Sequence, residues 1–136
     1  MVERQSYYVG VKGLIRNKAE ILVLRDTSTG KWELPGGRID KGGDIKSSFA
    51  REIEEEIKGA RLKKLGKIIH AAQGDFLVEN NYTLLLLFYL AIVDLPKTII
   101  LSKEHSGSAW VSAYSLLKYN IYSTDRAAIE LALSVI

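Results

Sequence analysis

Three glutamates near the middle of the chain have the spacing that brings carboxylates together on one face of a helix. At about 100° per residue, Glu52, Glu55 and Glu56 fall on one arc, because positions three and four apart share a helix face. The neighbouring arc is apolar and consists of Phe49, Ala50, Ile53 and Ile57. Carboxylates this close repel one another unless a cation lies between them, and oxygen ligands suit magnesium or manganese. The segment therefore indicates a divalent-metal site that presents its ion to substrate phosphates.

The residues before and around these glutamates resemble the Nudix box. The pattern of that box is a glycine, five residues, a glutamate, seven residues, and then Arg-Glu-aliphatic-x-Glu-Glu-x-Gly-aliphatic. Gly37 takes the first position, and Arg51 begins the central run at the expected spacing without an insertion. Residues 32–36, Trp-Glu-Leu-Pro-Gly, also resemble the usual lead-in. The resemblance covers Gly37 to Gly59.

Two positions depart from the box. Gly43 replaces the isolated glutamate, and the closing glycine arrives one position late, at Gly59. Two acids near Gly43 are candidates to substitute for the missing carboxylate, namely Asp40 and Asp44. Asp44 is the expected N-cap of the box helix, which would occupy its side chain and leave Asp40 freer. We therefore expect weakened metal binding, with the site retained.

The resemblance implies a reaction and a set of ligands. The reaction is attack of water on a diphosphate linkage, which separates a nucleoside diphosphate from another group with the help of Mg²⁺ or Mn²⁺. Glu52, Glu55 and Glu56 match the metal-ligand glutamates, and Glu55 is also assigned to catalysis. The backbone carbonyl of Gly36 matches a further oxygen ligand, and the pair Gly36–Gly37 lets the backbone approach a ligand closely.

Two further charged residues receive roles from the same resemblance. Arg51 is expected to orient the glutamates, with an ordinary surface ion pair as its alternative. Glu104 lies six residues before Trp110, in a segment that resembles the late loop from which many Nudix enzymes supply a metal ligand or general base. A solvated loop acid is the alternative there, and Glu79 and Asp75 are the next candidates for the base.

The histidines and aromatic residues give weaker signals. His105 is interpreted as a surface or loop-packing residue, and His70 as a histidine within a strand. Four aromatic residues have either nucleobase stacking or buried packing as their expected role. They are Trp32, Phe76, Tyr82 and Trp110.

Composition limits the class of protein. The 136 residues are 47% hydrophobic and 26% charged, which predicts one globular domain over 1–136. Nineteen basic and 16 acidic residues give a net charge of +3, too weak to indicate nucleic-acid binding. The absence of cysteine excludes disulfides and thiolate metal sites. The most apolar run, 82–93, is too short to span a membrane and predicts a buried strand. We expect a cytoplasmic monomer or homodimer without a signal peptide.

Alternating and apolar runs predict the secondary structure. The expected strands are 7–15, 20–25, 31–34, 62–72, 82–94 and 99–101. A hairpin turn is expected at 17–18 and a polar loop at 73–81. The expected helices are the box helix, which would end at Gly59, and two closing helices capped by Ser112 and by Ser123 or Asp125. The last helix would bury Ala128, Ile129, Leu131, Ala132 and Val135.

This order of elements predicts an α/β (α+β) fold, because helices interleaved with strands cover both faces of a sheet. The resemblance implies more specifically the Nudix-type α/β/α sandwich with a mixed central sheet. The substrate it implies is a nucleotide-derived diphosphate. Residues 74–76 show neither the proline of ADP-ribose hydrolases nor the tyrosine of diadenosine polyphosphate hydrolases. The short chain favours a nucleoside triphosphate hydrolase of the MutT-like sort.

Two other classes of function remain open from the sequence. A non-catalytic nucleotide-sensing module would explain Gly43, although such a module has no need for the glutamate triplet. A plain interaction domain would make the triplet incidental. Turnover of a nucleotide panel with magnesium separates the three classes.

Overall fold

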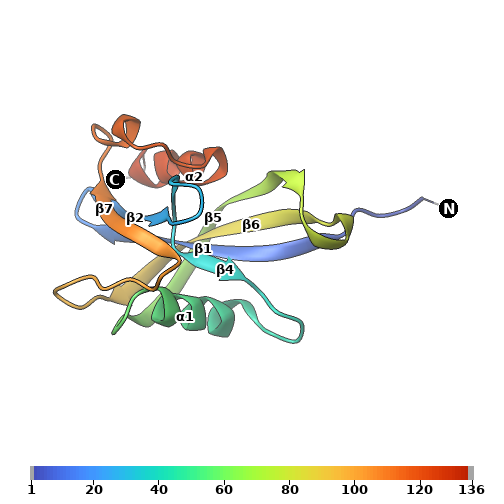
Figure 1. The fold of residues 1–136 in the computed structure, drawn as a ribbon, viewed down its shortest axis with the longest axis horizontal. Coiled ribbons are helices and arrows are strands. Elements are labelled where there is room, and N and C mark those ends of the chain that lie inside the picture. The colour runs from blue at the N-terminus through green and yellow to red at the C-terminus, as the bar shows by residue number, and fades with distance from the viewer. Residues whose placement is uncertain (1, 135–136) are drawn as a thin grey trace.

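The computed structural model describes residues 2–134, apart from the side chains of 75–77. Its strands are β1 (Tyr7–Asn17), β2 (Glu20–Asp26), β3 (Trp32–Glu33), β4 (Gly36–Arg38), β5 (Arg61–Leu77), β6 (Thr83–Asp94) and β7 (His105–Val111). Its helices are α1 (Ile45–Glu56) and α2 (Ser123–Ser134), with short 3₁₀ turns η1 (Glu79–Asn81) and η2 (Leu116–Lys118). The strands form a mixed sheet with α1 and α2 on opposite sides (Figure 1). The predicted α/β/α sandwich is confirmed.

Strand β1 is the centre of the sheet. One of its edges pairs in parallel with β6, from Tyr7 opposite Thr83 to Ile15 opposite Ala91. The other edge changes partner along its length. It pairs first with β4, where Gly10 lies opposite Arg38, and later with β2 through the predicted hairpin. The sheet order is β3-β2-β1-β6-β5, and β7 pairs with β2. Along this edge of β1, the paired strand therefore changes from β4 to β2 beyond Lys12, which lies opposite Gly36.

Helix α1 forms as the sequence predicts and ends slightly earlier. The Asp44 side chain accepts a hydrogen bond from the backbone N–H of Ser47 at 2.8 Å, which caps the helix. Phe49 and Ile53 are fully buried on its inner face. The helix stops at Glu56, because the next residue is extended and bridges to Leu101. The expectation that Gly59 ends the helix is wrong, since its positive φ belongs to the turn before β5.

Two apolar clusters hold the layers together. Beneath α1, the cluster includes Val11, Leu22, Leu24, Phe49 and Ile53. Beneath α2, the cluster includes Leu14, Leu34, Phe88, Ala128 and Ile129. The expected apolar residues of α2 divide accordingly: Ala132 is buried, Leu131 is 43% exposed, and Val135 lies outside the described residues. Strand β6 contributes to both clusters, which explains its nearly continuous apolar sequence.

Several element boundaries differ from expectation. β5 continues to Leu77, where a polar loop from 73 was expected, because β6 pairs with it that far. Residues 99–101 form only a single bridge, at Leu101. The first closing helix is the short turn η2. Asp125 does not cap α2, because its carboxylate accepts the Leu34 N–H instead.

The largest omission is β7. A loop was expected after Glu104, whereas residues 105–111 form a strand antiparallel to β2. Small and polar residues obscured a two-residue alternation of buried and exposed positions that begins at His105.

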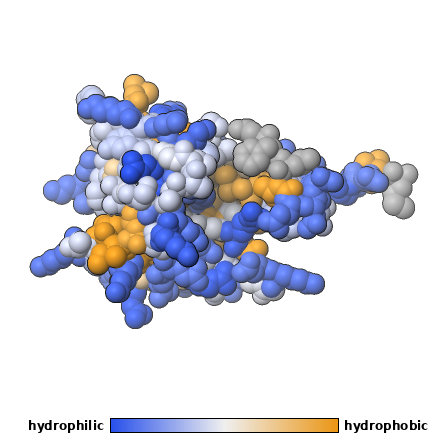
Figure 2. Space-filling view, viewed as in Figure 1, coloured by the Kyte–Doolittle hydropathy of each residue, from blue (hydrophilic) through white to orange (hydrophobic). Residues whose placement is uncertain are grey.

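The surface is mixed in character. Figure 2 shows hydrophilic side chains around an apolar patch over the segment between β6 and β7, where Ile100 is 54% exposed. Neither helix of the described chain is long and apolar enough to cross a membrane.

Candidate active site

Gly36 and Gly37 pack closely against neighbouring parts of the chain. Gly37 faces the carboxylate of Glu52, and a Cβ at Gly37 would lie 2.5 Å from the Glu52 Cδ. Gly36 has a φ of +144°, and a Cβ there would collide with the backbone carbonyl of Val11. Glycine is the residue that permits both features. Strand β4 therefore brings the backbone directly against the acidic face of α1.

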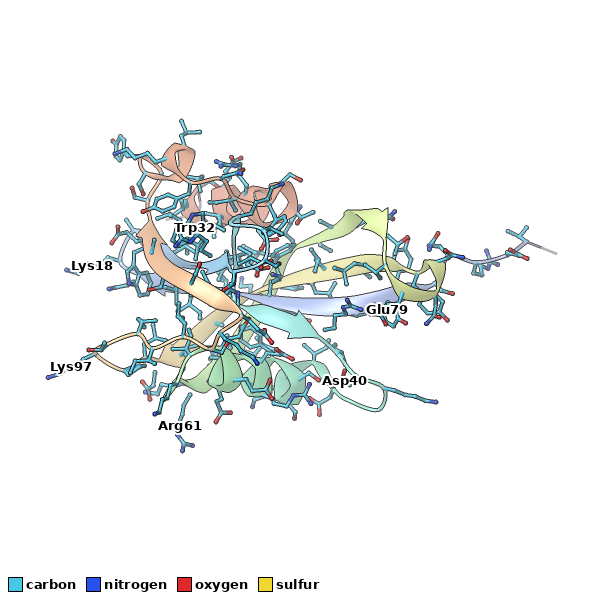
Figure 3. All side chains as sticks on the ribbon, in the orientation of Figure 1. Lys18, Trp32, Asp40, Arg61, Glu79 and Lys97 are labelled. Carbon is cyan, nitrogen blue, oxygen red and sulfur yellow. The ribbon has the colours of Figure 1, made fainter. Side chains whose placement is uncertain are left out.

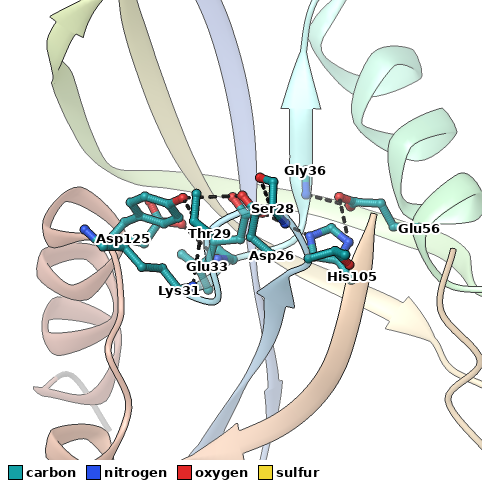
Figure 4. Close-up of polar contacts among 12 residues, drawn as sticks. Asp26, Ser28, Thr29, Lys31, Glu33, Gly36, Glu56, His105 and Asp125 are labelled. Carbon is teal, nitrogen blue, oxygen red and sulfur yellow. Dashed lines mark hydrogen bonds and ion pairs between the residues drawn. The ribbon is translucent and has the colours of Figure 1, made fainter. Parts of the chain in front are cut away.

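Glu56 is tied to this backbone. The Gly36 N–H donates a hydrogen bond to Glu56 Oε1 at 2.9 Å, and the glutamate side chain is only 6% exposed (Figure 4). Burial raises the pKa of Glu56 to about 8, against the opposing effects of His105, the Gly36 N–H and Lys12. In the metal-free protein, burial therefore favours the neutral form of this carboxyl.

His105 connects Glu56 to a second carboxylate. Its Nε2 lies 3.0 Å from Glu33 Oε2, and its Nδ1 lies 3.9 Å from Glu56 Oε2. Burial alone would lower the pKa of His105, but the hydrogen bond to Glu33 and the charge of Glu56 raise it. The expectation of a surface or loop histidine is wrong, because β7 carries this side chain into the interior, where it is 3% exposed.

The far end of this network is a buried lysine that the sequence analysis missed. Lys12 Nζ lies 2.9 Å from Glu33 Oε1 and 3.5 Å from Asp125 Oδ2, and it donates to the Leu34 carbonyl at 3.0 Å. Despite burial, the hydrogen bonds from His105 and the charge of Lys12 lower the pKa of Glu33 to about 2. Because Glu33 is thus an acceptor only, the Nε2 of His105 carries the donated proton. The feature of the sequence that could have indicated this buried charge is a lysine inside an otherwise apolar strand.

The outer side of α1 is solvated. Arg51 lies 3.1 Å from Asp40, 3.7 Å from Glu52 and 3.8 Å from Glu55. The side chain of Glu55 is 61% exposed. The structure thus places Arg51 near Glu52 and Glu55, two of the glutamates that it was expected to orient. Arg51 also pairs with Asp40, the acid that was expected to be free to substitute for the carboxylate missing at Gly43. Surface ion pairs of this kind contribute at most about 1 kcal/mol each.

Glu104 lies where two cavities meet. It is exposed and precedes β7, and its backbone carbonyl accepts the Thr27 N–H at 2.9 Å. The larger cavity, of about 920 Å³, is lined by Gly36, Gly37, Glu52 and Glu104 among others. The smaller, of about 550 Å³, is lined by Gly36, Glu56, Glu104 and His105 among others. The structure therefore places Glu104 beside the box, as the resemblance implied.

The alternative acids are only partly described. Glu79 lines the larger cavity and lies 3.5 Å from Arg38. The side chain of Asp75 lies outside the described residues. Figure 3 shows Glu79 below the start of β1 and Asp40 at the loop before α1, at the same end of the molecule.

The chemistry of the donors, rather than their present arrangement, suits a hard divalent cation. Burial and the charges of Glu55, Glu104 and Asp40 raise the pKa of Glu52, whereas Arg51 opposes that change. A cation would relieve this repulsion, and the donors are oxygens throughout. Among the described side chains, no three acidic or histidine groups stand close enough to hold a metal ion as they are arranged here.

The aromatic residues considered for nucleobase stacking lie in different environments. Trp32 packs edge-on against Tyr119, with ring centroids 5.0 Å apart, and lies toward α2 (Figure 3). Trp110 packs against the cluster beneath α1. Tyr82 lines the larger cavity, while the side chain of Phe76 lies outside the described residues. His70 lies in β5 and its ring is 5.6 Å from that of Phe88, as a strand histidine would be.

Comparison with known proteins agrees with this geometry. The family model of the NUDIX domain matches residues 6–132. The putative 8-oxo-dGTP diphosphatase 2 of Mycobacterium tuberculosis is 28% identical over 97 residues, which are 71% of this chain and 64% of that protein. Nudix hydrolase 7 of Arabidopsis thaliana is 41% identical over 58 residues, 38% of this chain and 21% of that protein. The match thus spans less than two thirds of either relative.

A solved structure extends the similarity across the fold. The MutT protein from Methanosarcina mazei Go1 has a TM-score of 0.78 and 25% identity, covering 98% of this chain and 97% of that one. Because the family model spans nearly the whole chain, the protein belongs to the Nudix family. The match includes the box between Gly37 and Gly59 from which the resemblance was drawn.

Proposed function

We propose that this protein is a divalent-metal-dependent hydrolase that cleaves the diphosphate linkage of a nucleotide-derived substrate. The observation that carries the proposal is the contact between β4 and α1. There, Gly36 and Gly37 lie directly against Glu56 and Glu52, at the junction of two cavities large enough for a substrate. The backbone of β4 and the carboxylates of α1 therefore lie together at the position where substrate phosphates and a cation would bind.

Each box residue has a distinct place in this proposal. Glu52, Glu55 and Glu56 would hold Mg²⁺ or Mn²⁺, which when bound neutralises phosphate oxygens. The carbonyl of Gly36 would add an oxygen ligand. Gly37 leaves room for Glu52 and the substrate. Arg51 holds Glu52 and Glu55 in position.

The proposed general base is Glu104. A base must accept a proton from the attacking water, so it needs to be ionised and accessible. Glu104 is exposed and lines both cavities, whereas Glu56 is buried with a pKa of about 8. Glu104 is therefore better placed for this role. Glu79 is the alternative on the same cavity.

The direct test is turnover. Purified protein is incubated with Mg²⁺, Mn²⁺ or EDTA and a panel of nucleoside triphosphates, 8-oxo-dGTP, ADP-ribose and dinucleotides, and released phosphate and pyrophosphate are measured. We expect hydrolysis of at least one substrate that EDTA abolishes and that Glu52→Gln lowers about a hundredfold. Tyr114→Ala is the matched control, because Tyr114 is 92% exposed and lines neither cavity.

The second candidate is a nucleotide sensor, favoured by Gly43. Tight nucleotide binding without turnover, under all metal conditions, would support the sensor and contradict the hydrolase. We further propose that residues 1–136 form one domain, and that the protein acts in the cytoplasm as a monomer or homodimer. Light scattering tests the oligomeric state.

A further inference from the structure

Of the three glutamates assigned to the metal, Glu56 is the one that Arg51 does not pair with in the described structure. Arg51 lies within ion-pair distance of Glu52 and Glu55. Glu56 Oε1 accepts the Gly36 N–H at 2.9 Å, and no hydrogen bond within the described residues reaches Oε2. Oε2 is therefore the oxygen that Glu56 has left for a cation, and a group other than Arg51 determines where it lies.

The group that faces this oxygen is the imidazole of His105. Its Nδ1 lies 3.9 Å from Glu56 Oε2 (Figure 4). Among the described side chains, Nδ1 is the one buried nitrogen or oxygen atom that has no hydrogen-bond partner. Such atoms are rare in folded proteins, because leaving a buried polar group unpaired costs free energy. A displacement of about 1 Å would bring Nδ1 and Oε2 into hydrogen-bond range.

The opposite side of the ring is anchored. Nε2 of His105 lies 3.0 Å from Glu33 Oε2, and Glu33 is itself paired with Lys12 at 2.9 Å. The His105 side chain is almost completely buried, so the ring has no alternative position in solvent. A hydrogen bond at one ring nitrogen determines what the other nitrogen offers. The anchor at Glu33 therefore leaves Nδ1 directed at Glu56.

The backbone sets the separation between Glu56 and His105. The Ser102 N–H donates to the Glu56 carbonyl at 3.0 Å, and the His105 N–H donates to the Ser102 carbonyl at 3.2 Å. The pairing of β7 with β2 also shifts register between Arg25 and Asp26, where His105 lies opposite Asp26. An irregularity of this kind redirects side chains at the end of a strand. Two backbone hydrogen bonds thus connect the end of α1 to the start of β7, independently of the side chains.

An imidazole nitrogen is a suitable partner for this carboxyl group. It accepts a hydrogen bond from a protonated carboxyl and, when protonated, donates one to an ionised carboxylate. Such a bond uses one lone pair of Oε2 and leaves the other for a cation, so His105 can hold the ligand without contacting the ion. Groups that orient a metal ligand in this way typically change metal affinity by about 10- to 100-fold.

We propose that His105 is a positioning residue, which holds the metal ligand Glu56 through a hydrogen bond between Nδ1 and Oε2. This proposal rests on the proposed function, in which Glu56 binds the cation. His105 acts through Glu56 alone, just as Arg51 acts through Glu52 and Glu55. The box glutamates are then positioned by two different residues, one in solvent and one in the interior.

Two substitutions separate the roles of the two ring nitrogens. The amide of asparagine reaches the position of Nδ1, and that of glutamine reaches the position of Nε2. His105→Gln therefore keeps a partner for Glu33 and removes that of Glu56, whereas His105→Asn does the reverse. Mn²⁺ affinity is measured from the electron paramagnetic resonance signal of the free ion, and stability from urea unfolding, after circular dichroism has verified folding.

The two variants should differ in opposite ways from the parent. His105→Gln should weaken Mn²⁺ binding at least about tenfold while its urea midpoint stays near that of the parent. His105→Asn should bind Mn²⁺ within about threefold of the parent and unfold at a lower urea concentration. His70→Gln is the matched control, because His70 is the other histidine of the chain and lines neither cavity at the box. It should leave the Mn²⁺ affinity unchanged.

Combined variants show whether His105 acts through Glu56. His105→Gln should weaken Mn²⁺ binding fully when combined with Glu55→Gln, but by less than about twofold when combined with Glu56→Gln. Equal losses in both combinations would overturn the proposal, as would Mn²⁺ affinity that falls in parallel with stability in the two His105 variants. If His105→Asn does not fold, unchanged Mn²⁺ affinity in His105→Gln overturns it. The expected pattern in a protein that hydrolyses no nucleotide would contradict the proposed function and support the positioning role.

Discussion

The side chain of Glu55 is 61% exposed, whereas that of its neighbour Glu56 is 6% exposed. Glu55 pairs with Arg51 in water, while Glu56 accepts a backbone N–H and faces His105 under β7. The 100° rotation between adjacent helix positions is enough to separate them. The box therefore combines an inner carboxylate held by the fold with an outer carboxylate that is solvated and paired with Arg51.

The largest expected difference is in activity. Glu56→Gln should lower kcat by about a hundredfold or more, because it removes the charge of a carboxylate that the fold holds in a buried position beside Gly36. Glu55→Gln should cost less, about tenfold, because water and neighbouring acids remain available to a bound cation. Steady-state kinetics at saturating magnesium measures both. Equal losses in the two variants would show that inner and outer positions do not differ in function.

The buried network beyond Glu56 should control stability in acid. Glu33→Gln should destabilise the protein by about 3 kcal/mol at neutral pH, because it leaves Lys12 and His105 without their shared partner. The lowered pKa of Glu33 means that its stabilisation is complete above about pH 4.5 and is lost as the pH falls toward 2. Urea unfolding at several pH values should therefore show the two proteins converging in acid. A gap independent of pH would mean that the Glu33 charge contributes nothing.

In metal-free protein, the contribution of Glu56 to stability should change with pH in the direction opposite to that of Glu33. The raised pKa of Glu56 means that the folded state binds an extra proton between about pH 4.5 and 8, so stability falls as the pH rises through that range. Glu56→Gln keeps an acceptor for the Gly36 N–H and removes this loss. It should be more stable than the parent by about 4 kcal/mol at pH 8 and similar at pH 4. Glu55→Gln is the control and should show no such trend in EDTA.

The smallest expected effect concerns Gly43. Its φ is not in the left-handed region, which Gly42 occupies instead at +85°. A Cβ at Gly43 would lie 2.8 Å from Ser48 Oγ, which can rotate away, and 3.1 Å from the Asp40 carbonyl. Gly43→Glu should therefore fold and tighten magnesium binding several-fold, as seen in the magnesium dependence of the rate. Gly43→Gln controls for bulk, and the same gain in that variant would contradict a role for charge.

Features that depend on residues close together in the sequence could be predicted, whereas features that depend on residues far apart could not. The start of the box helix, its Asp44 cap and the β1–β2 hairpin depend on residues close in the chain, and all three were predicted correctly, whereas the end of that helix was not. Lys12, Glu33, His105 and Asp125 come from four distant segments, so their network required the folded sheet. β7 was missed because its Ser and Gly residues have low strand propensity, and pairing with β2 overrides that preference.

The hydrogen bond from the Gly36 amide gives this site its own spectroscopic probe. An amide proton donated to a carboxyl oxygen shifts in resonance frequency as that oxygen gains or loses charge. In a ¹H–¹⁵N spectrum, the Gly36 cross-peak should therefore follow the titration of Glu56 near pH 8 in metal-free protein. Added magnesium should displace the proton and move that midpoint toward lower pH. One backbone signal of ¹⁵N-labelled protein would then report the occupancy of the site without substrate or turnover.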